Sequence, residues 1–172
     1  MSDASERSAT TRHVQMRYEP RAGDHESVRE IVTATGVFRR AEIEVAVELI
    51  EERLAKGVQS GYEFIFAEHD NQTIGYACYG HIACTIGSYD LYWLAVLPEE
   101  QRQRAGRLLL AEVEKILRRQ AARRLYIETS DGPRYVAARA FYESRGYLRS
   151  ATLHDYYAQG DSKIIYEKSL LS

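Results

Sequence analysis

Three groups of residues in this sequence combine types and spacings that could support chemistry. The first is the segment LPEEQRQRA, residues 97–105, which follows an apolar strand-like run and precedes a leucine-rich helical pattern. The N-terminus of a helix offers free backbone N–H groups and a favourable dipole to an anion, and Arg102, Arg104 and Arg107 add charges that pair with phosphate oxygens. The segment is either a phosphate-binding turn or the solvated basic start of an ordinary helix.

The second group is the segment AFYESRGY, residues 140–147. If Phe141 lies in the apolar stripe of a helix, Tyr142 is rotated by about 100° and leaves the core face. A phenol, with a pKa of about 10, could then donate a proton to a leaving group such as a thiolate. The alternative is a packing tyrosine, an interpretation that must hold for most of the 13 tyrosines in the chain.

The third group is a single acid, Asp90, at the start of the aromatic and apolar pattern DLYWLAV. Burial would raise the pKa of its carboxyl group and suit it to act as a general base. It could equally be a turn residue that ends the segment GSYD. The sequence leaves both interpretations open.

Hydrophobic periodicity predicts the elements that must position these groups. Three successive strand patterns indicate an antiparallel meander, and the strand, helix and strand that follow indicate a parallel crossover. Asp24 is expected to cap the first helix, and Leu54 is expected on the buried face of the second. Strands are expected within residues 13–20, 62–68, 70–80, 88–96, 123–129, 147–153 and 162–170, and helices within 23–36, 39–57, 104–120 and 133–146.

The composition fits one compact unit. The chain has 172 residues, of which 45% are hydrophobic and 28% charged, and its formal net charge is −2. This length supports one hydrophobic core, so we expect a single domain at residues 13–172 after a flexible tail at residues 1–12. We expect a cytoplasmic protein without a membrane partner, because neither an apolar signal segment nor a long apolar run is present.

Two binding roles are disfavoured. Cys78 and Cys84 lack the spacing of a metal or disulfide site, so we expect buried free thiols and no metal. The basic stretch at residues 102–124 could be a nucleic-acid-binding helix. Much of its surface is an apolar face suited to a core, so no nucleic-acid partner is expected.

Taken together and in this order, the three groups resemble the GNAT superfamily of N-acetyltransferases over about residues 13–170. The superfamily turn Q/R-x-x-G-x-G/A corresponds here to QRQRAG, in which Gln101 and Gly106 match and Arg104 replaces the first glycine. Glycine allows the backbone to approach a pyrophosphate closely, whereas arginine offers its own backbone N–H and a charge. Arg104 therefore marks either a weakened loop or an added phosphate contact.

The tyrosine motif A-x-x-F-Y-x-x-x-G-F/Y is matched at residues 138–147. The resemblance places the proton donor to the coenzyme A thiolate on Tyr142 and an acidic base of several relatives on Asp90. Tyr135 stands where an asparagine that contacts the coenzyme is usual, so that contact is not carried over.

The resemblance implies an α/β (α+β) fold, with a mixed, mostly antiparallel sheet of about seven strands flanked by about four helices. A βαβ core would bind acetyl-coenzyme A, and the implied activity is transfer of its acetyl group to a primary amine of a small molecule or peptide, by direct attack in a ternary complex. Coenzyme A contacts are implied at Leu94, Ala95, Val96, Gln101, Arg102, Gln103, Arg104, Ala105, Gly106, Arg107 and Ala138.

Other functions and the acceptor stay open at this point. A non-catalytic acyl-coenzyme A-binding module is the main alternative. His81 and Cys84 could lie near an acceptor pocket or be loop and core residues, and Tyr156 and Tyr157 could form aromatic walls of the same cleft. Relatives are commonly dimers, so a homodimer is among the expectations.

Overall fold

The structure is a computed structural model whose described residues are 13–171, apart from the side chains of Arg102 and Gln103. The tail expected at residues 1–12 lies outside the described residues. The described strands form one seven-stranded sheet in the order β1-β2-β3-β4-β5-β7-β6. They are β1 (Gln15–Arg17), β2 (Glu63–His69), β3 (Gln72–His81), β4 (Ser88–Val96), β5 (Arg124–Ser130), β6 (Leu148–Ala158) and β7 (Asp161–Ser169).

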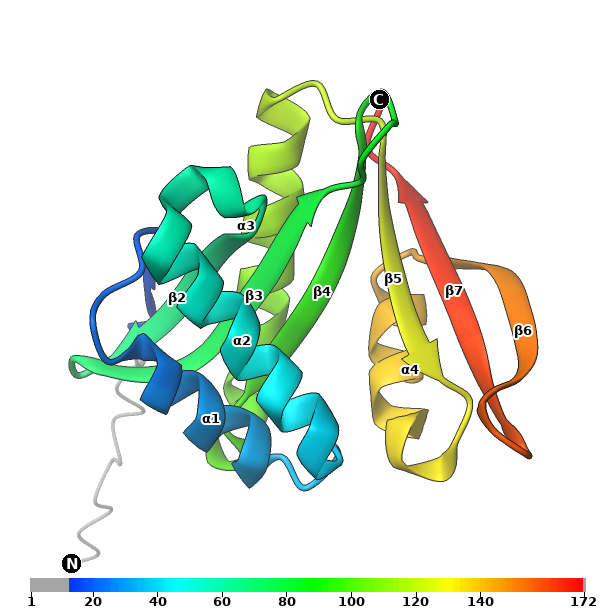
Figure 1. Ribbon diagram of the computed structural model, residues 1–172, viewed down its shortest axis with the longest axis horizontal. Helices are drawn as coiled ribbons and strands as arrows, with labels where there is room; N and C mark the ends of the chain where they lie inside the picture. The colour runs from blue at the N-terminus through cyan, green and yellow to red at the C-terminus, as the bar shows by residue number, and fades with distance from the viewer. Residues whose placement is uncertain (1–12, 172) are drawn as a thin grey trace, which may run out of the picture.

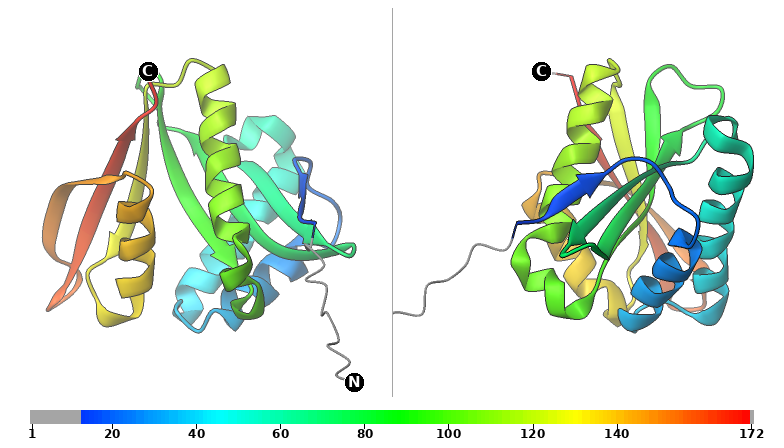
Figure 2. Two further views of the ribbon diagram at one scale, coloured as in Figure 1. Left: turned by 180° about the vertical axis from the view of Figure 1, so that it is seen from behind. Right: turned by 90° about the vertical axis from the view of Figure 1, so that its left-hand side faces the viewer.

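Helices cover both faces of the sheet, as Figures 1 and 2 show. α1 and α2 lie on one face, and α3 and α4 lie on the other. The predicted element order and the predicted mixed sheet are confirmed. The helices are α1 (Asp24–Ala34), α2 (Arg40–Lys56), α3 (Ala105–Arg119) and α4 (Val136–Ser144), with 3₁₀ turns η1 (Gly57–Ser60), η2 (Pro98–Gln103) and η3 (Pro133–Tyr135).

β4 and β5 run parallel but pair over only part of their length. Their ladder begins at Ser88 and Arg124 and ends at Leu91 and Ile127. Beyond that point the two strands diverge, as the green and yellow arrows of Figure 1 show. The predicted crossover, with α3 between the two strands, is confirmed, and the divergence leaves one edge of each strand without a sheet neighbour among the described residues.

A β-bulge in β4 lies where this divergence begins. Cys78 of β3 pairs with Trp93, but the next residue, Tyr79, pairs with Leu91, so Tyr92 is an extra residue in β4. An extra residue bends a strand and increases its twist. The bulge therefore bends β4 at the point where its pairing with β5 stops.

Two predictions about the first helices are wrong. Gly23, which has a φ of 94°, occupies the N-cap of α1, because the chain enters this helix through a left-handed residue. Asp24 is buried and accepts hydrogen bonds from the Arg17 guanidinium at 2.8 and 2.9 Å, which ties α1 to β1. In α2, Leu54 is 38% exposed and Arg53 is buried in its place. The guanidinium of Arg53 reaches a glutamate of β2 at 3.2 Å, so that face of α2 carries an ion pair.

The basic helix α3 is committed to the core on its apolar face. Leu109, Val113 and Leu117 are fully buried in the main hydrophobic cluster. The burial of this face is the behaviour that the sequence predicts for a core helix. No helix among the described residues is long and apolar enough to cross a membrane.

The prediction of two buried thiols is half right. Cys78 is buried within β3, but Cys84 is exposed in the loop before β4 and has a φ of 62°. A left-handed conformation is typical of tight loop positions on the surface. Cys84 therefore belongs to the turn between two strands and contributes nothing to the core.

Candidate active site

The divergence of β4 and β5 leaves backbone groups that could bind an extended ligand. The Leu97 N–H donates to the Ile74 carbonyl of β3 at 2.8 Å. Backbone groups alternate between the two sides of an antiparallel strand, so those of Val96 and Leu94 point away from β3 and toward the opening. The backbone of Ala95 points toward β3 by the same rule. Leu94 and Val96 therefore carry the outward-facing donors and acceptors of this strand.

The turn after β4 folds back onto the end of the strand. Gln101 Nε2 donates to the Val96 carbonyl at 3.1 Å. This bond holds η2 against β4 directly before α3 begins at Ala105. Gln101, which the sequence placed in a phosphate-binding turn, thus has a defined role in shaping that turn.

Arg104 adopts the backbone conformation that glycine usually provides. It is the N-cap of α3 with φ 70° and ψ 2°. This conformation costs a non-glycine residue about 1 kcal/mol. The Arg104 side chain is exposed and makes no hydrogen bond or ion pair with a described residue. Contacts within the described chain therefore do not account for an arginine at this strained position.

The remaining predicted coenzyme contacts lie at the start of α3 and on α4. Ala105 is fully buried, and a Cβ on Gly106 would meet Val96 Cγ2 at 3.7 Å, so this glycine lies directly beside β4. Arg107 is exposed and lines a cavity of about 320 Å³ between α3 and α4. Ala138 of α4 is half-buried against the core. The start of α3 is thus adjacent to both the open edge of β4 and this cavity.

Tyr142 is the buried residue of α4, so the prediction that it leaves the core face is wrong. It is 8% exposed, whereas Phe141 is only half-buried. The reason is that Tyr142 packs among the rings of Tyr147 and Tyr166, whose centroids lie 6.0 and 6.3 Å away. Burial raises the pKa of its phenol above the usual value. Its hydroxyl makes no hydrogen bond with a described residue.

Asp90 lies inside β4, opposite Gly80 of β3 and Tyr126 of β5, so it is not a turn residue. Burial, followed by the negative charge of Glu128, raises its pKa to about 6, and the positive charge of Lys163 acts in the opposite direction. A carboxyl group with this pKa is ionised at neutral pH and can accept a proton. Of the two interpretations that the sequence leaves open, the position of Asp90 within β4 favours the buried acid over the turn residue.

Register places Asp90 on the face of the sheet that α1 and α2 cover. Paired residues of antiparallel strands share a face, so Asp90 lies on the same side as Gly80 and Cys78. A Cβ on Gly80 would lie 2.4 Å from the carbonyl oxygen of Gly61 and 3.0 Å from the Tyr92 ring. Because Gly61 follows α2 and η1, this is the α1 and α2 face. Asp90 and Tyr142 therefore approach the β4–β5 opening from opposite faces of the sheet.

An ion pair next to Asp90 was missed by the sequence analysis. Lys163 Nζ donates to Glu128 Oε2 at 2.6 Å and lies 3.8 Å from the centroid of the Tyr156 ring. Glu128 and Lys163 are on β5 and β7, which pair antiparallel. The alternation of YIETS was a usable signal, since it places Glu128 on the same face as Tyr126, the residue paired with Asp90.

Three aromatic rings pack together on the face of the sheet that α1 and α2 cover. The ring of Phe38, between α1 and α2, lies 5.8 Å from that of Trp93 and 6.4 Å from that of Tyr135. The Tyr135 hydroxyl donates to Glu42 Oε1 at 3.1 Å. Tyr135, which replaces the usual asparagine, therefore links the start of α4 to α2 across the opening. A cavity of about 300 Å³, lined by Tyr135 and Arg39 among others, adjoins this contact.

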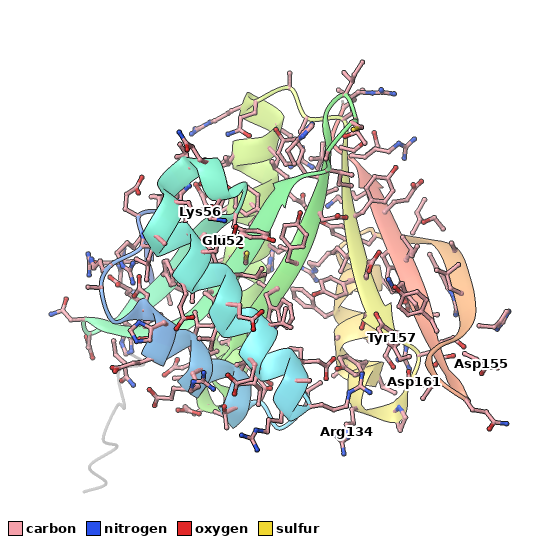
Figure 3. All side chains as sticks on the ribbon, in the orientation of Figure 1. Glu52, Lys56, Arg134, Asp155, Tyr157 and Asp161 are labelled. Carbon is pink, nitrogen blue, oxygen red and sulfur yellow. The ribbon has the colours of Figure 1, made fainter. Side chains whose placement is uncertain are left out.

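The other predicted acceptor residues separate into two groups. Tyr156 and Tyr157 lie at a bulge of β6 with ring centroids 5.0 Å apart. Figure 3 shows Tyr157 beside the end of β5. Glu128, Lys163 and Glu42 are close enough to act on the pKa of Tyr157, which burial chiefly raises. His81 is the last residue of β3, Cys84 lies in the loop after it, and both are exposed. The two tyrosines therefore lie beside Lys163, whose charge acts on Asp90, whereas the His81 ring lies 5.3 Å from that of Tyr89.

A family model described as the acetyltransferase (GNAT) family matches residues 26–147, which include the β4–β5 opening and α4. This match covers more than half of the chain. The chain belongs to the GNAT family of acetyltransferases. The GNAT resemblance inferred from the turn, the tyrosine motif and the element order is thereby confirmed.

Solved structures agree with this GNAT assignment. A protein from Desulfovibrio desulfuricans assigned to the GNAT family is 43% identical, with a TM-score of 0.90 over 92% of this chain and 100% of that chain. The ribosomal-protein-S18-alanine N-acetyltransferase of Escherichia coli is 19% identical, with a TM-score of 0.74 over 93% and 96%. The PaiA N-acetyltransferase of Thermoplasma acidophilum, solved with coenzyme A, is 20% identical, with a TM-score of 0.71 over 91% and 99%. The last two show a shared fold. Among curated proteins, none matches this chain.

Proposed function

We propose that this GNAT protein transfers an acetyl group from acetyl-coenzyme A to a primary amine, within a ternary complex. The observation that carries the proposal is the position of Asp90 and Tyr142 on opposite faces of one opening in the sheet. A base on one side of a thioester and an acid on the other are the two proton-transfer groups that amide formation requires.

The proposed coenzyme A-binding site consists mainly of backbone groups of β4 and of the start of α3. An extended pantetheine arm carries amide groups, and the outward-facing N–H and C=O groups of Leu94 and Val96 fit it as a neighbouring strand would. The pyrophosphate would lie at the N-terminus of α3, beside Gly106 and Arg107. We include Arg104 in this set, because a strained residue whose exposed side chain has no partner in the described chain is suited to a phosphate contact.

Asp90 starts the reaction in this scheme. An ammonium group has no lone pair, so Asp90, directly or through a water molecule, takes one proton from the acceptor. The nitrogen lone pair then forms a bond with the thioester carbonyl carbon, and the carbonyl electrons move onto oxygen. The Leu94 N–H, which points into the opening, is placed to donate to that oxyanion.

Tyr142 completes the reaction. When the carbon–sulfur bond breaks, its electron pair stays on sulfur, and the Tyr142 hydroxyl donates a proton to that thiolate. The raised pKa of Tyr142 keeps the phenol protonated until this step. As the amide forms, the nitrogen loses its second proton to solvent. The products are an amide and free coenzyme A, with Asp90 protonated and Tyr142 ionised. Exchange with solvent restores both groups, with a net release of one proton.

The direct test is a thiol-release assay with acetyl-coenzyme A and a panel of amino acids, polyamines, aminoglycosides and peptides with free N-termini. We expect at least one amine to raise thiol release above the rate with acetyl-coenzyme A alone, with the acetylated amine detected by mass spectrometry. Coenzyme A binding by calorimetry without transfer to any amine would instead favour a non-catalytic acyl-coenzyme A-binding module.

A further inference from the structure

Lys163 is a buried cation beside the proposed base. Lys163 lies on β7 and is only 7% exposed. Its ammonium group donates to Glu128 Oε2 at 2.6 Å and lies 3.8 Å from the centroid of the Tyr156 ring. Burying an ammonium group costs several kcal/mol unless partners replace its water shell. The chain therefore maintains a charge here at some cost.

The fold builds the surroundings of this charge with an irregular strand. Leu153 pairs with Lys163, but Ala158 pairs with Asp161, so residues 154–157 of β6 lie opposite Ser162 alone. This bulge brings Tyr156 over the ammonium group, and the ring of Tyr157 lies 5.9 Å from it. Aromatic faces attract cations. The bulge thus replaces water at the ammonium group with two rings.

Lys163 remains charged in this environment. Burial lowers its pKa, but the hydrogen bonds to Glu128 and Tyr156 and the charge of Glu128 outweigh that effect, and the net pKa is raised. The Glu128–Lys163 pair therefore places a negative charge on β5, the strand next to β4, and a positive charge on β7, the strand beyond β5.

Both charges act on Asp90. The groups that face it are Tyr92 from its own strand, Tyr126 and Glu128 from β5, and Lys163 from β7. Of these, Glu128 raises the pKa of Asp90 and Lys163 lowers it. A half-buried carboxyl group beside another carboxylate tends to take up a proton, and a nearby cation opposes this.

We propose that Lys163 is a positioning residue that keeps Asp90 ionised against the effects of burial and of Glu128. The inference deepens the proposed function and rests on it for the kinetic arm of its test. Without Lys163, burial and Glu128 act on Asp90 unopposed, so Asp90 would be protonated nearer neutral pH and could not accept the proton of the acceptor. Without Glu128, Lys163 acts alone and Asp90 stays ionised to a lower pH.

The test compares two substitutions of opposite sign. Lys163→Gln should move the Asp90 titration, followed by carbon NMR of the carboxyl group with Asp90→Asn as the assignment control, to higher pH by about one unit. Glu128→Gln should move it to lower pH, and Lys163→Arg should leave it nearly in place. The acidic limb of kcat/KM, measured with an amine found by thiol release, should move in the same directions, with KM rising in Lys163→Gln at pH 7.

Shifts of the same sign in Lys163→Gln and Glu128→Gln, or no shift in either, would overturn the inference. If Lys163→Gln fails to fold, Lys163→Met takes its place, because it removes the charge and keeps an apolar stem beside the Tyr156 ring. An Asp90 titration that does not move to higher pH in that variant would overturn the inference. The NMR titration needs no substrate, so it tests the role of Lys163 independently of the proposed acetyl transfer. A wild-type protein that transfers acetyl to no amine contradicts the proposed function, whereas unresponsive Asp90 titrations contradict only the role of Lys163.

Discussion

The two faces of the sheet present different chemistry to the same opening. On the α1 and α2 face, Asp90 lies among charges, with Glu128 and Lys163 close enough to shift its pKa. On the α3 and α4 face, Tyr142 lies among aromatic rings, and burial is the only cause of its raised pKa. Burial moves both pKa values upward, but the consequences differ.

For the carboxyl group, a pKa of about 6 brings it closer to that of an amine while leaving it ionised at neutral pH. For the phenol, a higher pKa keeps the proton in place. One physical effect therefore suits Asp90 to accept a proton and Tyr142 to donate one. The comparison teaches that the charged neighbours are needed only on the base side, where ionisation has to be maintained.

The largest expected effect comes from removing the acid on the aromatic face. Tyr142→Phe should lower turnover by about 10²-fold or more, the range of general acid catalysis, because the thiolate then leaves without a proton. Coenzyme A affinity, measured by calorimetry, should stay within a few-fold, since the ring and its packing are kept. Unchanged turnover would remove Tyr142 from the mechanism.

A second substitution tests whether the buried charges on the α3 and α4 face stabilise the fold. Glu114 of α3 is buried and accepts from Tyr147 at 3.0 Å and from Lys168 at 2.8 and 2.9 Å. Glu114→Ala leaves the Tyr147 hydroxyl without its acceptor and leaves Lys168 with only the Arg145 carbonyl, so it should lower the free energy of unfolding by about 2 kcal/mol. Glu52→Ala, which removes a surface ion pair with Lys56, is the control and should cost less than about 1 kcal/mol. Denaturant unfolding measures both, and equal losses would contradict the distinction.

The base side should show a conflict between stability and activity. The folded pKa of Asp90, about 6, is above its ordinary value of 3.8, so the folded state disfavours the ionised form at neutral pH. Asp90→Asn removes that penalty and should raise the melting temperature at pH 7. The gain should shrink as pH falls from 6 toward 4, because wild-type Asp90 is then protonated in the folded state. Thermal unfolding of both proteins at pH 5 and pH 7 measures this difference. If Asp90→Asn were less stable than the wild type at pH 7, burial would not be penalising the ionised carboxyl group of Asp90.

The smallest effect is expected where the two faces share the start of α3. Arg104→Gly relieves a left-handed arginine and should change the free energy of unfolding by about 1 kcal/mol or less in favour of the folded state. Coenzyme A affinity should fall several-fold, because a phosphate contact is lost. Arg107 has ordinary helical geometry, so Arg107→Gln should lower coenzyme A affinity without raising the free energy of unfolding. Tighter binding in Arg104→Gly would identify a weakened loop.

The fold was largely predictable from the sequence because its signals are local. Strand patterns with alternating or continuous apolar residues, and helices ended by residues such as Gly57, depend on neighbours a few positions away. The matching of Gln101, Gly106 and Tyr142 to a known spacing needed no knowledge of packing. These signals were sufficient to give the element order and the parallel crossover.

The parts of the site that could not be predicted depend on contacts between distant segments. Phe141 and Tyr142 are both large rings, and Tyr142 is the buried one because it packs against Tyr147 and against Tyr166 of β7, a distant strand. The extra residue Tyr92 follows from the register of β3 against β4, which has no sequence signature here. The Glu128–Lys163 pair, 35 positions apart, likewise requires the register of two strands.

The pH dependence of kcat/KM for wild type and Asp90→Asn, measured by thiol release between about pH 5 and 9, tests the central claim most directly. We expect the wild-type rate to fall below a pH near 6, where Asp90 becomes protonated, and Asp90→Asn to be at least about 10²-fold slower and to lack this limb. A variant that keeps both the wild-type rate and the wild-type acidic limb would contradict it.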